Sequence, residues 1–367
     1  MKVAVIGAGL IGGSVALAAS ARLGAHVSAY DPDEGAREAA ARRFAAPSAG
    51  DEGAPSFSAV PSVHASLREA LDGADAAVVA APLGVLDGAL GATLAAAGPD
   101  CLVTDVGSTK RALVAGHDDS RYVGGHPLAG AEAAGIGAAR ESLFAEATWY
   151  LTPTARTQGT LLERAHRLVS GLGAHPVTID AATHDRLVAT VSHLPHVLAN
   201  VLVGQAARAA GADHNLPATG PSFRDTTRVA GANPALWPDI YLANADALVE
   251  AIDEAVAALA EARKHLTEGD RPALEAWQEE AAAQRRALLE AGGFGGPTAL
   301  LRVAVPNRPG VIAELALTLG RGGVNISDMS LSPSPDGRNG VVTLWVAAAM
   351  ADRAAKLIAD GGHPVTT

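Results

Sequence analysis

Residues 1–14 read MKVAVIGAGLIGGS, a short apolar run followed by a glycine-rich turn. Gly7, Gly9 and Gly12 have the spacing G-x-G-x-x-G, with a strand pattern before them and a helical pattern after them. The first glycine permits a tight turn, the second lets the backbone approach a pyrophosphate, and the third allows the helix to pack closely on the strand. The stretch therefore predicts a dinucleotide-binding βα unit.

Residues 7–13 are expected to form the turn, which includes Leu10 and Ile11, and the helix predicted at 14–22 is expected to bind the cofactor phosphates at its N-terminus. Free N–H groups and the helix dipole favour negative charge there. Asp31 ends the next predicted strand, where its carboxylate would accept hydrogen bonds from an adenosine ribose and repel a 2′-phosphate. This pattern favours NAD over NADP, although Arg37 nearby leaves some tolerance of NADP. An ordinary aspartate at a strand end is the alternative interpretation.

Short apolar segments continue to alternate with helical segments up to about residue 180. Further strands are predicted at 76–80, 102–105 and 149–152. Strands that alternate with helices predict a mostly parallel, Rossmann-like sheet with right-handed crossovers. The stretch 45–61, rich in Ala, Ser, Gly and Pro, is expected to be a surface loop.

Two further domains are predicted after the α/β domain at 1–180. Residues 181–291 contain long helices with apolar side chains three and four positions apart, which predicts an all-α domain whose apolar faces fit a dimer interface or a monomeric core. The composition of 291–297 predicts a linker. Residues 298–367 follow a β-α-β-β-α order with a last strand at the terminus, typical of a ferredoxin-like βαββαβ module.

The composition narrows the class of protein. Of the 367 residues 49% are hydrophobic, and the net charge is −11 without a basic run, which argues against nucleic acid or an anionic membrane as the main partner. A single cysteine excludes a disulfide framework and a thiolate metal site. No uninterrupted apolar run is long enough to span a membrane, and no signal peptide is recognised, so a cytoplasmic protein is expected.

Two motifs at predicted strand ends contain candidate catalytic side chains. In TDVGSTK, residues 104–110, Ser108 could hydrogen-bond a substrate hydroxyl or could simply cap a helix. In GGHPLAGAE, residues 124–132, His126 is expected on a constrained loop, where a neutral imidazole could accept a proton from a hydroxyl as hydride leaves. A loop histidine that binds backbone is the alternative. Glu132 could orient His126 or a substrate, or be a solvated carboxylate.

Two motifs lie in the predicted helical domain. SHLPH, residues 192–196, places His193 and His196 on one helix face, but no carboxylate or cysteine completes a metal site, so no metal is expected. FRDTTR, residues 223–228, ends in Arg228, and arginine suits bidentate binding of a carboxylate. A surface ion pair is the alternative for this arginine.

Over about residues 1–290, these motifs resemble in order and spacing the prephenate/arogenate dehydrogenases of tyrosine biosynthesis. His-Pro-Leu-Ala-Gly at 126–130 and Ser-His-Leu-Pro-His at 192–196 together make the resemblance specific. It implies NAD-dependent oxidative decarboxylation of prephenate to 4-hydroxyphenylpyruvate, or of arogenate to tyrosine. It also implies that the helical domain forms a homodimer.

The resemblance also implies roles for individual residues. His126 would take the proton of the substrate 4-hydroxyl, and Ser108 would hold the same hydroxyl. Aromatisation supplies the driving force, so the protein mainly has to orient the reacting groups. The substrate-binding residues that the resemblance implies are Arg228, His193, His196 and Glu132.

The C-terminal module resembles the ACT-type amino-acid-sensing domains. The resemblance rests on VPNRPGVI at 305–312 and GVNI at 323–326. Asn307 replaces the usual acidic residue of the motif, which weakens the expectation of effector binding. Tyrosine or another aromatic amino acid is the implied effector, and a dimerisation appendage that senses nothing is the alternative.

Two other functions compete with this interpretation. Other Rossmann-plus-helical dehydrogenases, such as β-hydroxy acid dehydrogenases and imine reductases, typically have a lysine on the first long helix, whereas residues 181–210 contain none. A non-catalytic NAD-dependent sensor would keep the glycine turn but would not need His126, Ser108 and Arg228 together.

Overall fold

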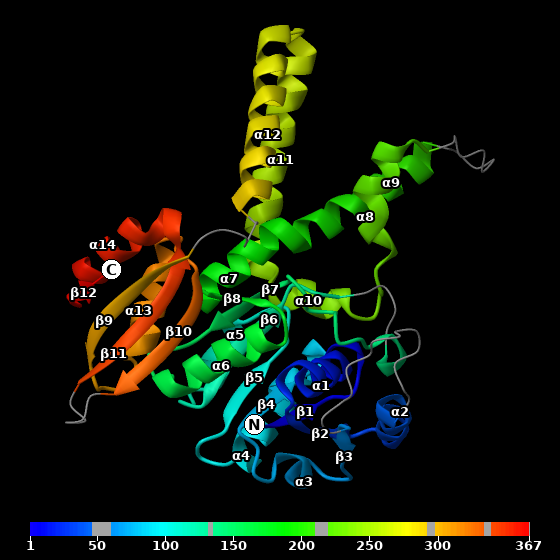
Figure 1. Ribbon diagram of the computed structural model, residues 1–367. Helices are drawn as coiled ribbons and strands as arrows, with labels where there is room; N and C mark the ends of the chain where they lie inside the picture. The colour runs from blue at the N-terminus through cyan, green and yellow to red at the C-terminus, as the bar shows by residue number, and fades with distance from the viewer. Residues whose placement is uncertain (46–59, 131–134, 210–218, 292–297, 334–338, 367) are drawn as a thin grey trace, which may run out of the picture. The chain divides into compact units, whose positions relative to one another are not determined.

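The computed structural model describes residues 1–45, 60–130, 135–209, 219–291, 298–333 and 339–366 (Figure 1). The chain divides into two compact units, one of residues 1–184 with 296–367 and the other of residues 185–295. Most of the loop predicted at 45–61 and of the linker predicted at 291–297 lies outside the described residues.

The first unit is built on an eight-stranded sheet in the order β3-β2-β1-β4-β5-β6-β7-β8. Neighbouring strands are parallel except β6 and β7, which are antiparallel. Every residue of β4 and β5 is buried, as expected for central strands covered on both faces. The predicted Rossmann-like, mostly parallel sheet is therefore confirmed. The strands are β1 (Lys2–Ile6), β2 (His26–Tyr30), β3 (Ser62–Val63), β4 (Ala76–Val79), β5 (Leu102–Asp105), β6 (Tyr122–Pro127), β7 (Thr148–Thr152) and β8 (His175–Thr178).

Helices cover this sheet, and α1 is buried along most of its length because small side chains let it approach β1 and β2. The helices of this part are α1 (Leu10–Leu23), α2 (Glu34–Ala45), α3 (Leu67–Leu71), α4 (Leu83–Ala96), α5 (Arg111–Gly116), η1 (Ile136–Ala138), α6 (Gly159–Gly171) and α7 (Ala181–Val188).

The C-terminal module also belongs to the first unit. Its strands form an antiparallel sheet in the order β10-β11-β9-β12, and β9 alternates exposed and buried residues because one face is covered. The element order matches the predicted βαββαβ pattern. The elements are β9 (Thr298–Pro306), α13 (Val311–Arg321), β10 (Ile326–Pro333), β11 (Asn339–Ala347), η4 (Ala348–Met350), α14 (Ala351–Asp360) and β12 (Val365–Thr366).

Helix α13 packs against α6 and β8, and its N-cap residue Gly310 and its residue Gly320 lie very close to backbone atoms of the first unit. A Cβ on Gly310 would lie 2.0 Å from the carbonyl oxygen of Ala155, and one on Gly320 would lie 2.2 Å from that of Thr178. Only glycine fits at these two positions, because any side chain would overlap a backbone carbonyl oxygen.

A polar contact joins the same helix to the turn before α7. Asp180 accepts hydrogen bonds from the backbone N–H and the hydroxyl of Thr183, and the Nε atom of Arg321 on α13 lies 3.4 Å from its Oδ2 atom. Burial raises the pKa of Asp180, but the hydrogen bonds from Thr183 and Arg321 outweigh it and lower the pKa below its ordinary value. The C-terminal module is thus bound to the start of α7.

The second unit is helical, in agreement with the predicted all-α domain, and α11 and α12 run side by side as a hairpin (Figure 1). Asn244 separates α10 from α11. The elements that follow α7 are η2 (Ala189–His193), α8 (Leu194–Ala209), α9 (Pro221–Thr227), η3 (Arg228–Gly231), α10 (Trp237–Ala243), α11 (Ala245–Glu268) and α12 (Arg271–Ala291).

The first long helix changes its hydrogen-bonding pattern in the middle. Residues Ala189–His193 form a π-helical turn, which ends two residues before Pro195. Proline has no N–H to bond the preceding turn, so the ladder is already weakened at this place. Single π turns of this kind often occur at functional sites.

The continuous helical segment Ala181–Ala209 is long and apolar enough to cross a membrane, judged by length and composition alone. It is the one such segment within the described ranges. No membrane-spanning helix was predicted from the sequence, because an uninterrupted apolar run was required. Mean hydropathy over a window is a less strict criterion, since it tolerates single polar residues. A helix that packs against another protein passes the same test.

His166 makes stability depend on pH. Its imidazole is fully buried on α6, Nε2 lies 2.9 Å from the hydroxyl of Thr178, and burial lowers the pKa of His166 to about 4. The unfolded chain therefore binds a proton more readily between pH 6.5 and 4, so this residue costs about 3 kcal/mol of folding free energy as pH falls through that window. We expect His166→Gln to flatten the pH dependence of unfolding by denaturant. Parallel curves for the two proteins would contradict this.

Candidate active site

The glycine turn after β1 has the geometry that the sequence predicts. Gly7 has a φ of +106°, and a Cβ on it would lie 2.4 Å from the carbonyl oxygen of Ala80. A Cβ on Gly12 would lie 1.9 Å from the carbonyl oxygen of Gly7. A Cβ on Gly9, in contrast, would meet no atom of the described residues within 4 Å. Gly7 and Gly12 are therefore required by the chain itself, whereas Gly9 leaves open space beside the backbone.

The N-terminus of α1 points its donors into this turn. Gly9 is the N-cap residue and has no side chain to bond the first N–H groups, and Leu10 and Ile11 follow in the first turn, both partly exposed. A helix start with uncapped N–H groups beside open space fits the pyrophosphate of a dinucleotide.

Asp31 contacts the glycine turn directly. Its Oδ2 atom accepts a hydrogen bond of 2.8 Å from the N–H of Ala8, and its Oδ1 atom accepts one of 3.0 Å from the N–H of Asp33. A carboxylate oxygen can accept more than one hydrogen bond, so both oxygens keep capacity for ribose hydroxyls. Arg37 donates through Nη1 to the carbonyl oxygens of Asp31 and Pro32, which fixes its position in the same loop.

Ser108 and His126 belong to neighbouring parts of the sheet. β5 and β6 are parallel, with Val103 opposite Tyr122, and Ser108 lies in the turn after β5, partly exposed. Helix α5 begins at Arg111 with Lys110 as its N-cap residue, so Ser108 lies two residues before the N-cap position.

His126 lies in strand β6, so the prediction of a loop was wrong. Its backbone pairs with Tyr150 of the antiparallel strand β7, and its side chain is 9% exposed. The two glycines and the proline around it indicated a loop, but the pairing with β7 extends the strand as far as Pro127. The imidazole is therefore fixed at the carboxyl end of a strand, where ligands bind in open α/β sheets.

A second histidine, which the sequence did not single out, supports His126. Nδ1 of His126 lies 2.9 Å from Nε2 of His184 on α7, and the His184 ring is fully buried with its edge or face against His126 and Tyr150. The signal that the sequence offered was the adjacent pair His184 and Asp185, two polar residues within an amphipathic helix. The contact at Nδ1 fixes the orientation of the His126 ring.

The helical unit holds the second group of site residues. His196 stacks on the Trp237 ring at a centroid distance of 3.5 Å, and His193 meets the same ring edge-on at 6.1 Å. Burial and the nearby Arg228 guanidinium lower the pKa of His196, so this imidazole favours the neutral form. Trp237 was not predicted, although a tryptophan in a chain with 4% aromatic residues is a usable signal.

Asn244 fixes the tautomer of His193. Its Nδ2 atom donates to the carbonyl oxygen of Asp185 at 2.8 Å and lies 3.3 Å from Nδ1 of His193. Since an amide nitrogen only donates, Nδ1 of His193 accepts, and its Nε2 carries the proton. Asn244 lies between α10 and α11, so the break between these two helices places its side chain against His193.

The predicted residues thus form two groups. The first unit brings together the glycine turn, Asp31, Ser108 and His126, and the helical unit brings His193 and His196 to Trp237, with Arg228 close enough to affect His196. Glu132 lies outside the described residues. Among the described residues no cluster of His, Cys, Asp and Glu could hold a metal ion.

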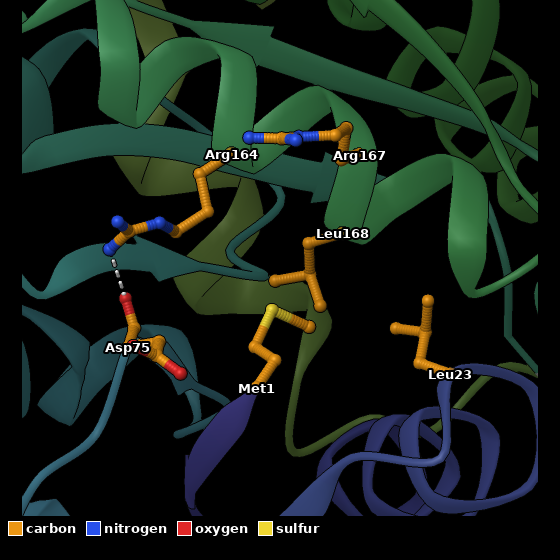
Figure 2. Close-up of a pocket in the computed structure, with 6 residues that line it drawn as sticks. All are labelled: Met1, Leu23, Asp75, Arg164, Arg167 and Leu168. Carbon is orange, nitrogen blue, oxygen red and sulfur yellow. Dashed lines mark hydrogen bonds between the residues drawn. The ribbon is translucent and has the colours of Figure 1, made fainter.

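A surface pocket lies at the amino ends of the central strands, next to the start of β1. Figure 2 shows Arg164 and Arg167 of α6 above Met1, with Leu168 between them. Arg164 donates to the carbonyl oxygens of Asp75 and Asp100, before β4 and β5, at 2.8 and 2.6 Å. The guanidinium therefore ties α6 to the strand starts, and the pocket is remote from the carboxyl ends where a dinucleotide binds.

Two domain models of known families match this chain. "Prephenate dehydrogenase, nucleotide-binding domain" matches residues 18–178, and "Prephenate dehydrogenase, dimerization domain" matches residues 180–280. The chain belongs to the prephenate dehydrogenase family. The predicted family resemblance is thereby confirmed, and so are the predicted enzyme class, an NAD-dependent oxidoreductase, and its cofactor NAD.

Individual proteins with prephenate or arogenate dehydrogenase names are similar to this chain in sequence or in structure. A prephenate dehydrogenase of Bacillus subtilis (strain 168) is 34% identical over 256 residues, which are 67% of this chain and 68% of that protein. Synechocystis arogenate dehydrogenase superposes with a TM-score of 0.66 at 28% identity and covers 78% of this chain and 100% of its own. The prephenate dehydrogenase from A. aeolicus, solved with hydroxyphenyl propionate and NAD+, shares the fold at a TM-score of 0.69 and 24% identity, over 78% of this chain and 98% of its own.

Proposed function

We propose that this member of the prephenate dehydrogenase family oxidises prephenate with NAD, releasing CO2 and 4-hydroxyphenylpyruvate. The observation that carries the proposal is the buried His126 imidazole, held at Nδ1 by His184 at the carboxyl end of β6 and next to the turn that contains Ser108. Such a group suits removal of a hydroxyl proton at neutral pH.

The chemistry then divides among the residues of this chain. His126 takes the proton of the ring hydroxyl, and its contact with His184 orients the imidazole for this step. Ser108 holds the same hydroxyl through Oγ. NAD, when bound, supplies the hydride acceptor. Loss of CO2 makes the ring aromatic, so orientation of the groups supplies much of the catalysis.

The helical unit is proposed to bind the rest of the substrate. Arg228 holds a carboxylate, and His193 and His196 line the pocket together with Trp237. The Nε2–H of His193 is a donor whose direction Asn244 fixes. Glu132 is proposed to join this polar network. These roles agree with a substrate that has two carboxylates and a ring.

A homodimer built through the helical unit completes the proposal. Apolar side chains of α8 stay exposed within the chain, and the matched domain is described as a dimerization domain. A second copy would cover them, which also accounts for the apolar composition of this helix. The exposed residues on this helix are Leu198, Val201, Leu202 and Val203. We propose a cytoplasmic location for such a biosynthetic enzyme.

The C-terminal module is proposed to be an ACT-type regulatory domain. Its βαββαβ order and its antiparallel sheet support this assignment. Tyrosine or another aromatic amino acid is the proposed effector. The division into domains at 1–180, 181–291 and 298–367 belongs to the same proposal.

Absorbance of reduced nicotinamide tests the proposed reaction. Prephenate and arogenate are each offered with NAD and with NADP, with and without tyrosine. Turnover of prephenate with NAD is the expected result, and Asp31 predicts that NADP is the poorer cofactor. Turnover of arogenate alone would favour arogenate dehydrogenation, which the similarity to the Synechocystis enzyme makes the second candidate. No turnover of either substrate by protein that binds NAD would favour a non-catalytic sensor.

A further inference from the structure

A buried carboxylate lies beneath the proposed catalytic pair. Asp105 is the last residue of β5 and is fully buried. Its Oδ1 atom accepts from the N–H of Gly107 at 2.7 Å and from the Lys110 ammonium, which is fully buried as well. Its Oδ2 atom accepts from the Tyr122 hydroxyl at 2.7 Å and from the N–H of Gly125 at 3.2 Å.

The four donors come from the two segments that contain the proposed catalytic residues, the turn after β5 and strand β6. Gly107 immediately precedes Ser108, and Gly125 immediately precedes His126. Lys110 ends the Ser108 turn, and Tyr122 begins the strand that contains His126. One carboxylate therefore bonds on both sides of the gap between the two proposed catalytic residues.

The backbone is shaped to let these bonds form. A Cβ on Gly125 would lie 2.4 Å from the carbonyl oxygen of Asp105, and one on Gly107 would lie 3.0 Å from Oδ1 of Asp105. Glycine at both positions allows the two segments to approach the carboxylate. Tyr122 remains a donor at any physiological pH, because burial and then the Asp105 charge raise the pKa of Tyr122 well above its ordinary value.

A buried carboxylate is stable only if it is paired and fully hydrogen-bonded, and such groups often fix one arrangement of the surrounding chain. We infer that Asp105, with Lys110 and Tyr122, is a positioning cluster that sets the separation and orientation of Ser108 and His126. This inference rests on the proposed function, since it concerns the same two residues. None of the three side chains is proposed to touch the substrate.

Tyr122→Phe is the sharpest test, because it removes one donor from Asp105 and keeps the buried ring. Displacement by about 1 Å can cost on the order of 100-fold in rate, and the loss of one of four donors is expected to lower kcat roughly tenfold. The KM for prephenate and the Kd for NAD should change less than about twofold, because their proposed contacts are elsewhere. Thr93→Val is the matched control. It removes another fully buried hydroxyl, which bonds the carbonyl oxygen of Ala89 within α4, and its kcat should stay at the wild-type value.

A second background separates positioning from general damage. With His126→Asn in place, adding Tyr122→Phe should lower the remaining rate less than about twofold. The imidazole whose position relative to Ser108 the cluster sets is then absent. An equal loss in both backgrounds, or an unchanged kcat in the single variant, would overturn the positioning role while wild-type turnover upholds the proposed function. A wild-type chain that binds NAD but turns over neither prephenate nor arogenate would overturn both.

Discussion

Replacing His126 with asparagine is expected to lower kcat by roughly 100- to 10,000-fold, the range that a positioned general base contributes. Asparagine keeps a polar side chain of similar size at the end of β6, but its amide cannot take a proton from the substrate hydroxyl. The Kd for NAD should stay within about twofold, because the glycine turn and Asp31, which follow β1 and β2, are unchanged. Steady-state kinetics and NAD titration by protein fluorescence measure the two quantities.

His26→Asn is the control for this substitution. His26 is an exposed histidine that begins β2, at the amino end of the strand, whereas the proposed site lies at the carboxyl ends. Its loss should leave kcat unchanged. Full turnover by the His126 variant would contradict the assignment of the base and would favour the non-catalytic sensor.

Alanine at Gly9 is expected to weaken NAD binding by about 10- to 100-fold without lowering the melting temperature. The added methyl group meets no atom of the described residues within 4 Å, so the fold accepts it. It does occupy the space through which a pyrophosphate approaches the backbone, and overpacking of this kind costs about 1–3 kcal/mol, the equivalent of that loss of affinity. Calorimetric titration with NAD and a thermal melt of the free protein check both parts.

Gly12→Ala gives the informative comparison. Its methyl group would lie 1.9 Å from the carbonyl oxygen of Gly7, so this variant should lose both NAD affinity and thermal stability. Equal affinity of wild type and the Gly9 variant for NAD would mean that the pyrophosphate does not approach the backbone there. The two variants together separate contact with the cofactor from support of the turn.

Local patterns account for the parts that the sequence predicted well. The glycine turn needs only the strand before it and the helix after it, and both are visible within residues 1–23. The alternation of strands and helices likewise predicted the sheet. His126 shows where this reasoning ended, because two glycines and a proline indicate a loop locally, whereas pairing with a distant strand made it part of a sheet.

The supporting residues escaped prediction for a related reason. His184 is 58 positions from His126, and Asn244 is 51 positions from His193, so neither contact is visible as a spacing in the sequence. The role of Asp105 was hidden in the same way, since its bonds to Tyr122 and Gly125 exist only once β5 and β6 are paired. Motifs of this chain identified groups that could react, and only the folded chain identified the groups that hold them.

The close contacts of Gly310 and Gly320 limit which C-terminal segments of related proteins could replace the one in this chain. Gly310 and Gly320 each face a backbone carbonyl oxygen, of Ala155 and Thr178, and a backbone cannot move aside as a flexible side chain can. A chimera with a foreign C-terminal segment would dock in the same way only if that segment also had glycine at both places. A substitution at either glycine therefore requires a compensating change in the backbone that it faces.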